Sequence, residues 1–107
     1  MITQTDNWIY VLEENEIEVE DIKRFDHEKK TFCIYRLSDG YFATDGVCTH
    51  EEIHLEDGLV FDDQVECPMH QGVFNIKTGK ALAPPVCEDL KTYPVKVEDG
   101  KVYILIK

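Results

Sequence analysis

The sequence lacks several features, and each absence excludes a class of protein. No apolar run in its 107 residues approaches the length of a membrane-spanning helix. The first ten residues contain neither the basic region nor the apolar segment of a signal peptide, so we expect a cytoplasmic protein. Basic residues are scarce, because 11 Lys and Arg stand against 22 Asp and Glu, for a net charge of −11. We therefore expect neither nucleic acid nor membrane as a partner, since both need cationic surfaces.

One stretch of the chain has no basic residue at all. Between Leu37 and Ile76 there is no Lys or Arg, while nine acidic residues lie there. A surface with one sign of charge attracts oppositely charged proteins and speeds their encounter. We therefore expect an acidic docking surface for basic protein partners. Its carboxylates are those of Asp39, Asp45, Glu51, Glu52, Glu56, Asp57, Asp62, Asp63 and Glu66.

Short segments rich in β-branched and aromatic residues alternate with turn sequences along the whole chain. This pattern, with a hydrophobic fraction of 43%, predicts one domain over residues 1–107. Its predicted fold is all-β, an antiparallel β-sandwich or small barrel. The predicted strands are Trp8–Leu12, Asp21–Phe25, Thr31–Leu37, Tyr41–Asp45, Leu59–Phe61, Gln64–Glu66, Val73–Asn75, Tyr93–Glu98 and Lys101–Ile106.

Two local features extend this prediction. The last two strands read as a hairpin on Asp99-Gly100, a dipeptide suited to a type I′ turn. The segment Glu13–Glu20 is compatible with a short helix, but its Ile and Val residues leave its conformation open.

Two short motifs carry residues that bind metals. The first is Cys48-Thr49-His50, and the second is Cys67-Pro68-Met69-His70, with sixteen residues between His50 and Cys67. Each motif pairs a thiolate with an imidazole and follows a predicted strand. Two adjacent loops at one end of a sheet could then present four ligands together. Thiolates favour iron–sulfur clusters or zinc, and imidazole suits iron, zinc or copper.

The order of the ligands separates the two main alternatives. A structural zinc site is satisfied by two cysteines and two histidines, but zinc fingers usually place the cysteines in one knuckle and the histidines in another. Here each motif supplies one ligand of each kind. That order favours a centre with two inequivalent metals, in which the cysteines hold one iron and the histidines the other.

The pattern Cys-x-His, sixteen residues, Cys-x-x-His resembles the ligand signature of the Rieske family. The resemblance covers Trp8 to Ile106 and is closest to the small ferredoxins of bacterial ring-hydroxylating oxygenases. It implies antiparallel sheets with one [2Fe–2S] cluster held by two loops at one tip. It also implies that Cys48 and Cys67 bind the inner iron, and that His50 and His70 bind the outer iron near the surface. By the same resemblance, Gly79 and the segment Ala83-Pro84-Pro85 match a third loop of the family, which covers the cluster.

By this resemblance the protein is a soluble electron carrier rather than an enzyme. It would take electrons from a flavin-dependent ferredoxin reductase and pass them to a terminal oxygenase, and we expect it to be a monomer. One alternative is the small Rieske-like subunit of an assimilatory nitrite reductase. The other is the structural zinc module considered above.

Departures from the respiratory Rieske proteins carry further predictions. Those proteins have an extra cysteine in each of the two cluster loops, and the two cysteines form a disulfide. At the matching positions this chain has Ile53 and Met69. They also have a serine and a tyrosine whose hydroxyls donate hydrogen bonds near the cluster, whereas this chain has Gly72 and Phe74. Fewer donors destabilise the reduced, more negative cluster, so we expect a low reduction potential.

The remaining cysteines and histidines are expected to bind no metal. Cys33 lies in a predicted strand and is expected to be a buried, inert thiol. Cys87 follows the proline segment and is expected to be an unliganded thiol. His54 is expected to be a solvent-exposed loop residue, and nothing in the sequence assigns a role to His27.

Overall fold

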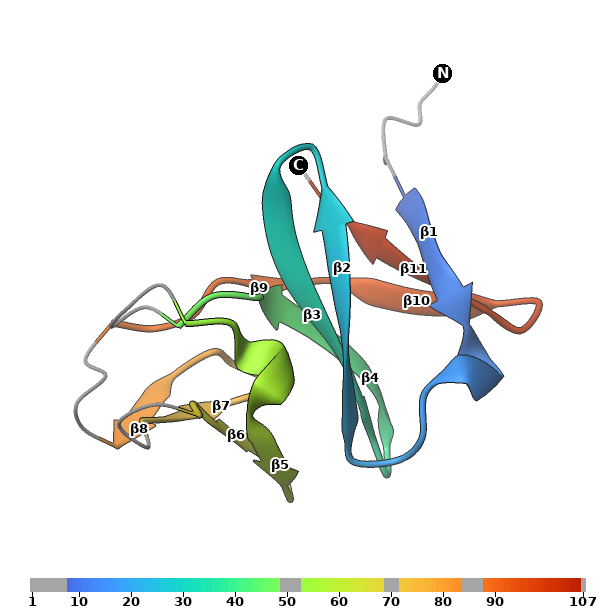
Figure 1. Ribbon diagram of the computed structural model, residues 1–107. Helices are drawn as coiled ribbons and strands as arrows, with labels where there is room; N and C mark the ends of the chain where they lie inside the picture. The colour runs from blue at the N-terminus through green and yellow to red at the C-terminus, as the bar shows by residue number, and fades with distance from the viewer. Residues whose placement is uncertain (1–7, 49–52, 69–71, 84–87, 107) are drawn as a thin grey trace.

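The computed structural model describes residues 8–48, 53–68, 72–83 and 88–106 (Figure 1). These residues form eleven strands and two short 3₁₀ helices, η1 (Glu14–Glu16) and η2 (Leu55–Asp57). All strand pairs among them are antiparallel, so the predicted all-β fold is confirmed. No helix in the described ranges is long and apolar enough to cross a membrane.

The strands are arranged in three sheets. The first has the order β1–β11–β10, with β1 at Trp8–Glu13, β10 at Val95–Glu98 and β11 at Lys101–Leu105. The second, central sheet has the order β2–β3–β4–β9, with β2 at Asp21–His27, β3 at Lys30–Leu37, β4 at Gly40–Asp45 and β9 at Thr92–Tyr93. The third, which we call the small sheet, has the order β5–β6–β7–β8, with β5 at Leu59–Phe61, β6 at Gln64–Glu66, β7 at Val73–Asn75 and β8 at Ala81–Ala83.

Strand β3 lies at the centre of the molecule, because it is buried on both faces. Successive side chains on a strand point to opposite faces. Phe32 and Ile34 pack with residues of the first sheet, whereas Cys33 and Tyr35 pack with residues of the small sheet. The near-continuous apolar sequence of β3 is therefore explained by two hydrophobic cores, one on each side of the central sheet.

The strands and turns agree with the sequence predictions, with two exceptions among the strands. Asp99 and Gly100 both have positive φ, at 54° and 77°, which confirms the predicted hairpin turn. The predicted strand Tyr93–Glu98 is interrupted at Pro94, which has no N–H to donate to a neighbouring strand. Strand β8 was not predicted, because its sequence Ala-Leu-Ala carries little strand propensity. In the segment left open, only Glu14–Glu16 is helical.

Candidate metal centre

Two loops of matching construction begin at Cys48 and Cys67. The N–H of Cys48 donates to the carbonyl of Ile53 at 2.8 Å, and the N–H of Cys67 donates to the carbonyl of Gly72 at 2.7 Å. Each cysteine is therefore bonded to the residue five positions later. Both predicted histidines fall inside these closed loops, but His50 and His70 lie outside the described residues.

The first loop is fixed to the central sheet by backbone contacts. Strand β4 ends three residues before Cys48, and the N–H of Gly46 donates to the carbonyl of Thr31 at 2.8 Å. A Cβ atom on Gly46 would lie 2.6 Å from the Thr31 side chain, so a larger residue would push the two segments apart. After the loop, Val47 and His54 form an isolated β-bridge, and the N–H of Leu55 donates to the carbonyl of Gly46 at 2.9 Å.

The second loop connects two paired strands of the small sheet. Cys67 directly follows β6, and Gly72 directly precedes β7, with Glu66 opposite Val73 in the register. The loop is thus the tip of a β-hairpin, and its position is set by the pairing below it. Gly58 packs closely against this hairpin, because a Cβ atom there would lie 2.4 Å from the carbonyl oxygen of Glu66.

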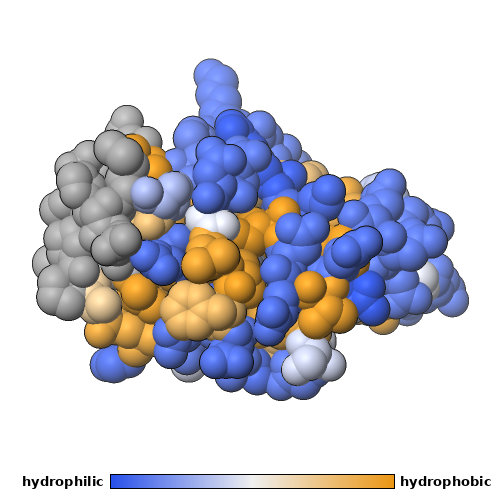
Figure 2. Space-filling view, turned by 60° about the horizontal axis from the view of Figure 1, so that its bottom comes forward, coloured by the Kyte–Doolittle hydropathy of each residue, from blue (hydrophilic) through white to orange (hydrophobic). Residues whose placement is uncertain are grey.

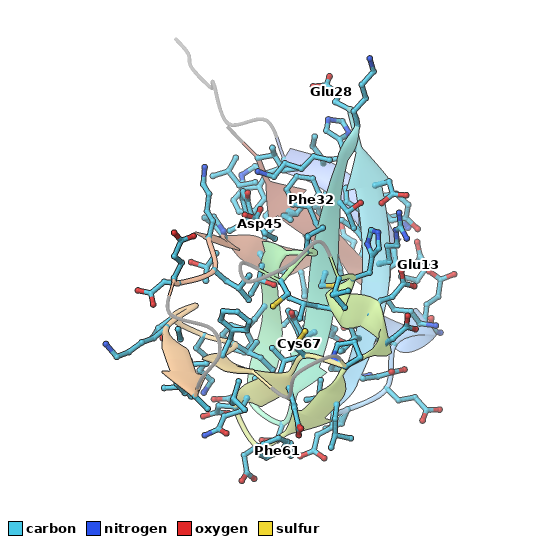
Figure 3. All side chains as sticks on the ribbon, turned by 60° about the vertical axis from the view of Figure 1, so that its left-hand side comes forward. Glu13, Glu28, Phe32, Asp45, Phe61 and Cys67 are labelled. Atoms are coloured by element: carbon cyan, nitrogen blue, oxygen red, sulfur yellow. The ribbon has the colours of Figure 1, made fainter. Side chains whose placement is uncertain are left out.

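Both cysteines are buried in the same hydrophobic core. Cys48 is 5% exposed and Cys67 is 2% exposed, although both begin loops. Figure 3 shows the sulfur atoms of the described cysteines in the interior of the molecule, with Cys67 labelled. The apolar residues of this core come from both the central and the small sheet, and they include Tyr35, Leu55, Val65, Phe74, Ile76 and Leu90.

This arrangement fits a metal group that is held by thiolates on its inner side. Two thiols from different loops enter one water-poor core, where a thiolate needs a cation to be stable. The predicted imidazoles follow two and three residues later, within the same loops. Two thiolates and two imidazoles suit an iron–sulfur cluster of the Rieske kind.

Cys33 also lies in this core. The prediction that its thiol is buried is confirmed. Its burial raises the pKa of the Cys33 thiol to about 12, so it stays protonated at neutral pH. It is hydrogen-bonded to Tyr35, whose hydroxyl in turn shares a 2.8 Å hydrogen bond with Thr44. Thr44 donates to the carbonyl of Asp45 at 2.7 Å, so the buried polar groups form a satisfied chain. Cys87 lies outside the described residues.

The prediction for His54 is wrong. His54 is half-buried rather than exposed, and it pairs with Val47 in the β-bridge. Its Nδ1 atom is buried and has no hydrogen-bond partner among the described residues. No local sequence pattern indicates this burial, because it depends on the bridge between two segments on either side of the first loop.

Ion pairs hold the small sheet and η2 to the rest of the molecule. Arg24 on β2 donates to Glu56 on η2 at 2.9 Å, and Lys77 binds both Asp39 and Asp63. The Lys77 ammonium holds the pKa of Asp39 below its usual range. Asp45 also pairs with Lys30, at 3.3 Å, so four of the nine predicted docking carboxylates are partly neutralised within the chain.

Comparison with known proteins decides between the alternatives. Residues 7–94 match the Rieske [2Fe–2S] domain family. The chain belongs to this family. The ferredoxin component of a naphthalene 1,2-dioxygenase system from Pseudomonas aeruginosa is 39% identical over 100 residues, which are 94% of this chain and 96% of that protein. The ferredoxin component of a 2,4-dinitrotoluene dioxygenase system from Burkholderia sp. (strain RASC) is 37% identical over the same shares.

Solved structures agree with this assignment. A ferredoxin of Sphingomonas yanoikuyae B1 has a TM-score of 0.88 at 32% identity, covering 94% of this chain and all of that one. A chain from a complex of reduced oxygenase and oxidised ferredoxin in carbazole 1,9a-dioxygenase has a TM-score of 0.89 at 30% identity, covering 94% of each chain. A nitrite reductase small subunit from Mycobacterium tuberculosis shares the fold at 18% identity, covering 97% of this chain and 98% of that one, with a TM-score of 0.84.

The family settles the cofactor and the kind of protein. This Rieske ferredoxin carries one [2Fe–2S] cluster and acts as an electron carrier, like the ferredoxin components that it resembles. The zinc alternative is therefore set aside. The nitrite reductase alternative rests on the fold alone, whereas the ferredoxin components are similar in sequence along nearly the whole chain.

Proposed function

We propose that Cys48, His50, Cys67 and His70 hold the [2Fe–2S] cluster, with the two cysteines on the inner iron. The observation that supports this most directly is the matched pair of loops, each closed by a hydrogen bond from the cysteine N–H to the residue five positions later. The cluster supplies one-electron transfer when bound. The chain contributes two buried thiolates, a fixed loop geometry and a core that keeps water from the sulfur side.

We further propose that the protein is a cytoplasmic monomer and a single Rieske domain over residues 1–107. In this proposal, a flavin-dependent reductase supplies its electrons and a terminal oxygenase receives them. The support is its likeness to ferredoxin components of dioxygenase systems, and to a ferredoxin that forms a complex with its oxygenase. The acidic residues between Leu37 and Ile76 suit partners with basic surfaces.

Two measurements test this function. The purified protein should be red-brown and contain two irons and two acid-labile sulfides, and its reduced form should give the low average g value of a histidine-ligated cluster in electron paramagnetic resonance. It should also restore product formation when it replaces the ferredoxin in a naphthalene 1,2-dioxygenase assay that contains the reductase and oxygenase components. A colourless protein with one zinc would refute the cluster assignment, and an intact cluster without turnover would refute the proposed partners.

A further inference from the structure

The small sheet has one face in the core and one face on the surface. Val60, Val65, Phe74 and Ala81 pair across the four strands and point inward, where Val65 and Phe74 are fully buried. The next row of the register is Leu59, Glu66 and Val73, and side chains on adjacent positions of a strand point to opposite faces. This row therefore lies on the outside of the sheet, and we call it, together with Phe61, the outer row.

The outer row is apolar except for Glu66, and its β5 residues are exposed. Leu59 is 61% exposed and Phe61 is 37% exposed, and both lie on β5, an edge strand of the sheet. Figure 3 shows Phe61 at the margin of the molecule, while Cys67 lies inside it. Val73 continues the apolar surface and is half-buried. Large apolar side chains grouped on an exposed sheet face are a common mark of a protein interaction site.

The outer row lies beside the proposed metal centre. Glu66 directly precedes Cys67, and Val73 directly follows Gly72, so the row ends where the second loop begins. Figure 2, in which the bottom of Figure 1 comes forward, shows apolar surface gathered on one face of the molecule. A partner that covers the outer row would thus contact Glu66, the residue that directly precedes the proposed ligand Cys67.

The charges around the outer row indicate the chemistry of the partner. Asp57, Asp62 and Glu66 form no ion pair with any described residue, in contrast to Glu56 and Asp63. Glu66 lies within the outer row, Asp62 directly follows Phe61, and Asp57 lies two residues before Leu59. No Lys or Arg lies between Leu37 and Ile76. A second copy of the chain would bring the same carboxylates and another net charge of −11. Like charges at an interface are unfavourable, so a basic partner suits this surface better than self-association.

We propose that the outer row is a docking surface for the protein that accepts electrons from this ferredoxin. Leu59 and Phe61 enter an apolar depression on that partner, and the uncompensated carboxylates of Asp57, Asp62 and Glu66 meet Lys or Arg side chains around it. This inference rests on the proposed function as an electron carrier. It adds an apolar contact and a defined sheet face to the general acidic attraction.

The test compares a variant that lacks the apolar side chains of the outer row with a matched control. Leu59→Ser combined with Phe61→Ser removes the exposed apolar side chains of the outer row, and Val97→Ser removes an exposed apolar side chain from another sheet. Val97 is 42% exposed on β10, next to the Asp99-Gly100 turn, and it belongs to the first sheet rather than to the small sheet. Stopped-flow absorbance follows electron transfer from each reduced, cluster-loaded protein to the oxidised oxygenase component of naphthalene 1,2-dioxygenase. Ferricyanide, a small oxidant, serves as the second acceptor.

The double variant should reduce the oxygenase about tenfold more slowly in the second-order regime, as expected when interface anchors are removed. Its rate with ferricyanide, its reduction potential and its electron paramagnetic resonance spectrum should equal those of the wild type. Val97→Ser should match the wild type in every assay. Asp57→Asn with Asp62→Asn should also slow transfer to the oxygenase and should reduce the dependence of that rate on salt.

Each other outcome overturns a defined part of the argument. A wild type without a cluster signal, or without reaction with ferricyanide, contradicts the proposed function itself. A wild type that reacts with ferricyanide but not with the oxygenase contradicts the proposed partner, and a double variant as fast as the wild type contradicts the docking surface. Sedimentation that shows a wild-type dimer and a monomeric double variant would assign the outer row to a second copy of the chain.

Discussion

Gly79 and Leu90 touch through their backbones. The N–H of Leu90 donates to the carbonyl of Gly79 at 2.7 Å, and a Cβ atom on Gly79 would lie 2.1 Å from the Leu90 carbonyl oxygen. Gly79 also has φ of 78°, in the left-handed region. The contact joins the turn after β7 to the segment that leads into β9, so it helps to hold the small sheet on the central sheet.

The first prediction separates the effect of this backbone contact on stability from the effect of the positive φ. Gly100 has nearly the same φ, 77°, but a Cβ atom there would meet only Glu14, at 3.9 Å. Gly100→Ala should lower the free energy of unfolding by about 1 kcal/mol, because it adds left-handed strain alone. Gly79→Ala should lower it by on the order of 3 kcal/mol, because a backbone clash is added. Urea unfolding followed by circular dichroism measures both, and equal losses would show that the segments separate without cost.

The second prediction concerns the proposed ligands. Cys48→Ser and Cys67→Ser should each abolish the visible spectrum of the cluster, because each removes a thiolate from the inner iron. Cys33→Ala is the matched control, since Cys33 is buried in the same core but is not a proposed ligand. His54→Ala should also keep the spectrum, since His54 is not a proposed ligand. Iron and sulfide analysis of the four purified variants checks this, and loss of the cluster in either control would mean that the ligands are assigned wrongly.

The third prediction is a reduction potential near the low end of the Rieske range, roughly −150 mV. The reason is that neither Gly72 nor Phe74 carries a hydroxyl, and Phe74 is fully buried in the core with both cysteines. Gly72→Ser combined with Phe74→Tyr should raise the potential, because hydrogen bonds near the sulfurs stabilise the reduced form. Protein-film voltammetry measures both proteins. A wild-type potential above zero would contradict the argument from missing donors.

The fourth prediction concerns stability at alkaline pH. Burial raises the pKa of the Cys33 thiol from 9.0 to about 12, so the folded protein keeps a proton that the unfolded chain loses. The stability that this thiol contributes is complete below the unfolded pKa and is lost as the pH rises toward the folded one. Cys33→Ala should therefore show a shallower decline in unfolding free energy between about pH 9 and 12 than the wild type. Urea titrations across this range compare the two slopes, and parallel curves would show that the thiol is not shielded.

Much of the fold follows from local sequence patterns. Short β-branched segments and the Asp99-Gly100 turn predicted nearly all strands, because strand alternation and left-handed turns depend on neighbouring residues. The two Cys and His motifs likewise predicted an iron–sulfur cofactor, since the ligand types and their spacing follow from the chemistry of the group, and the assignment of its four ligands stays a prediction.

Other properties depend on contacts between distant segments, which no local pattern reports. Strand β8 exists because β7 provides a partner for Ala81 and Ala83, although Ala-Leu-Ala has little strand propensity. His54 is half-buried because Val47 lies beside it, and Glu56 is neutralised because β2 brings Arg24 to η2. The outer row exists only when Leu59 and Val73 are placed on the same face by strand register. Burial and charge compensation are sums over spatial neighbours, and packing of the sheets chooses those neighbours.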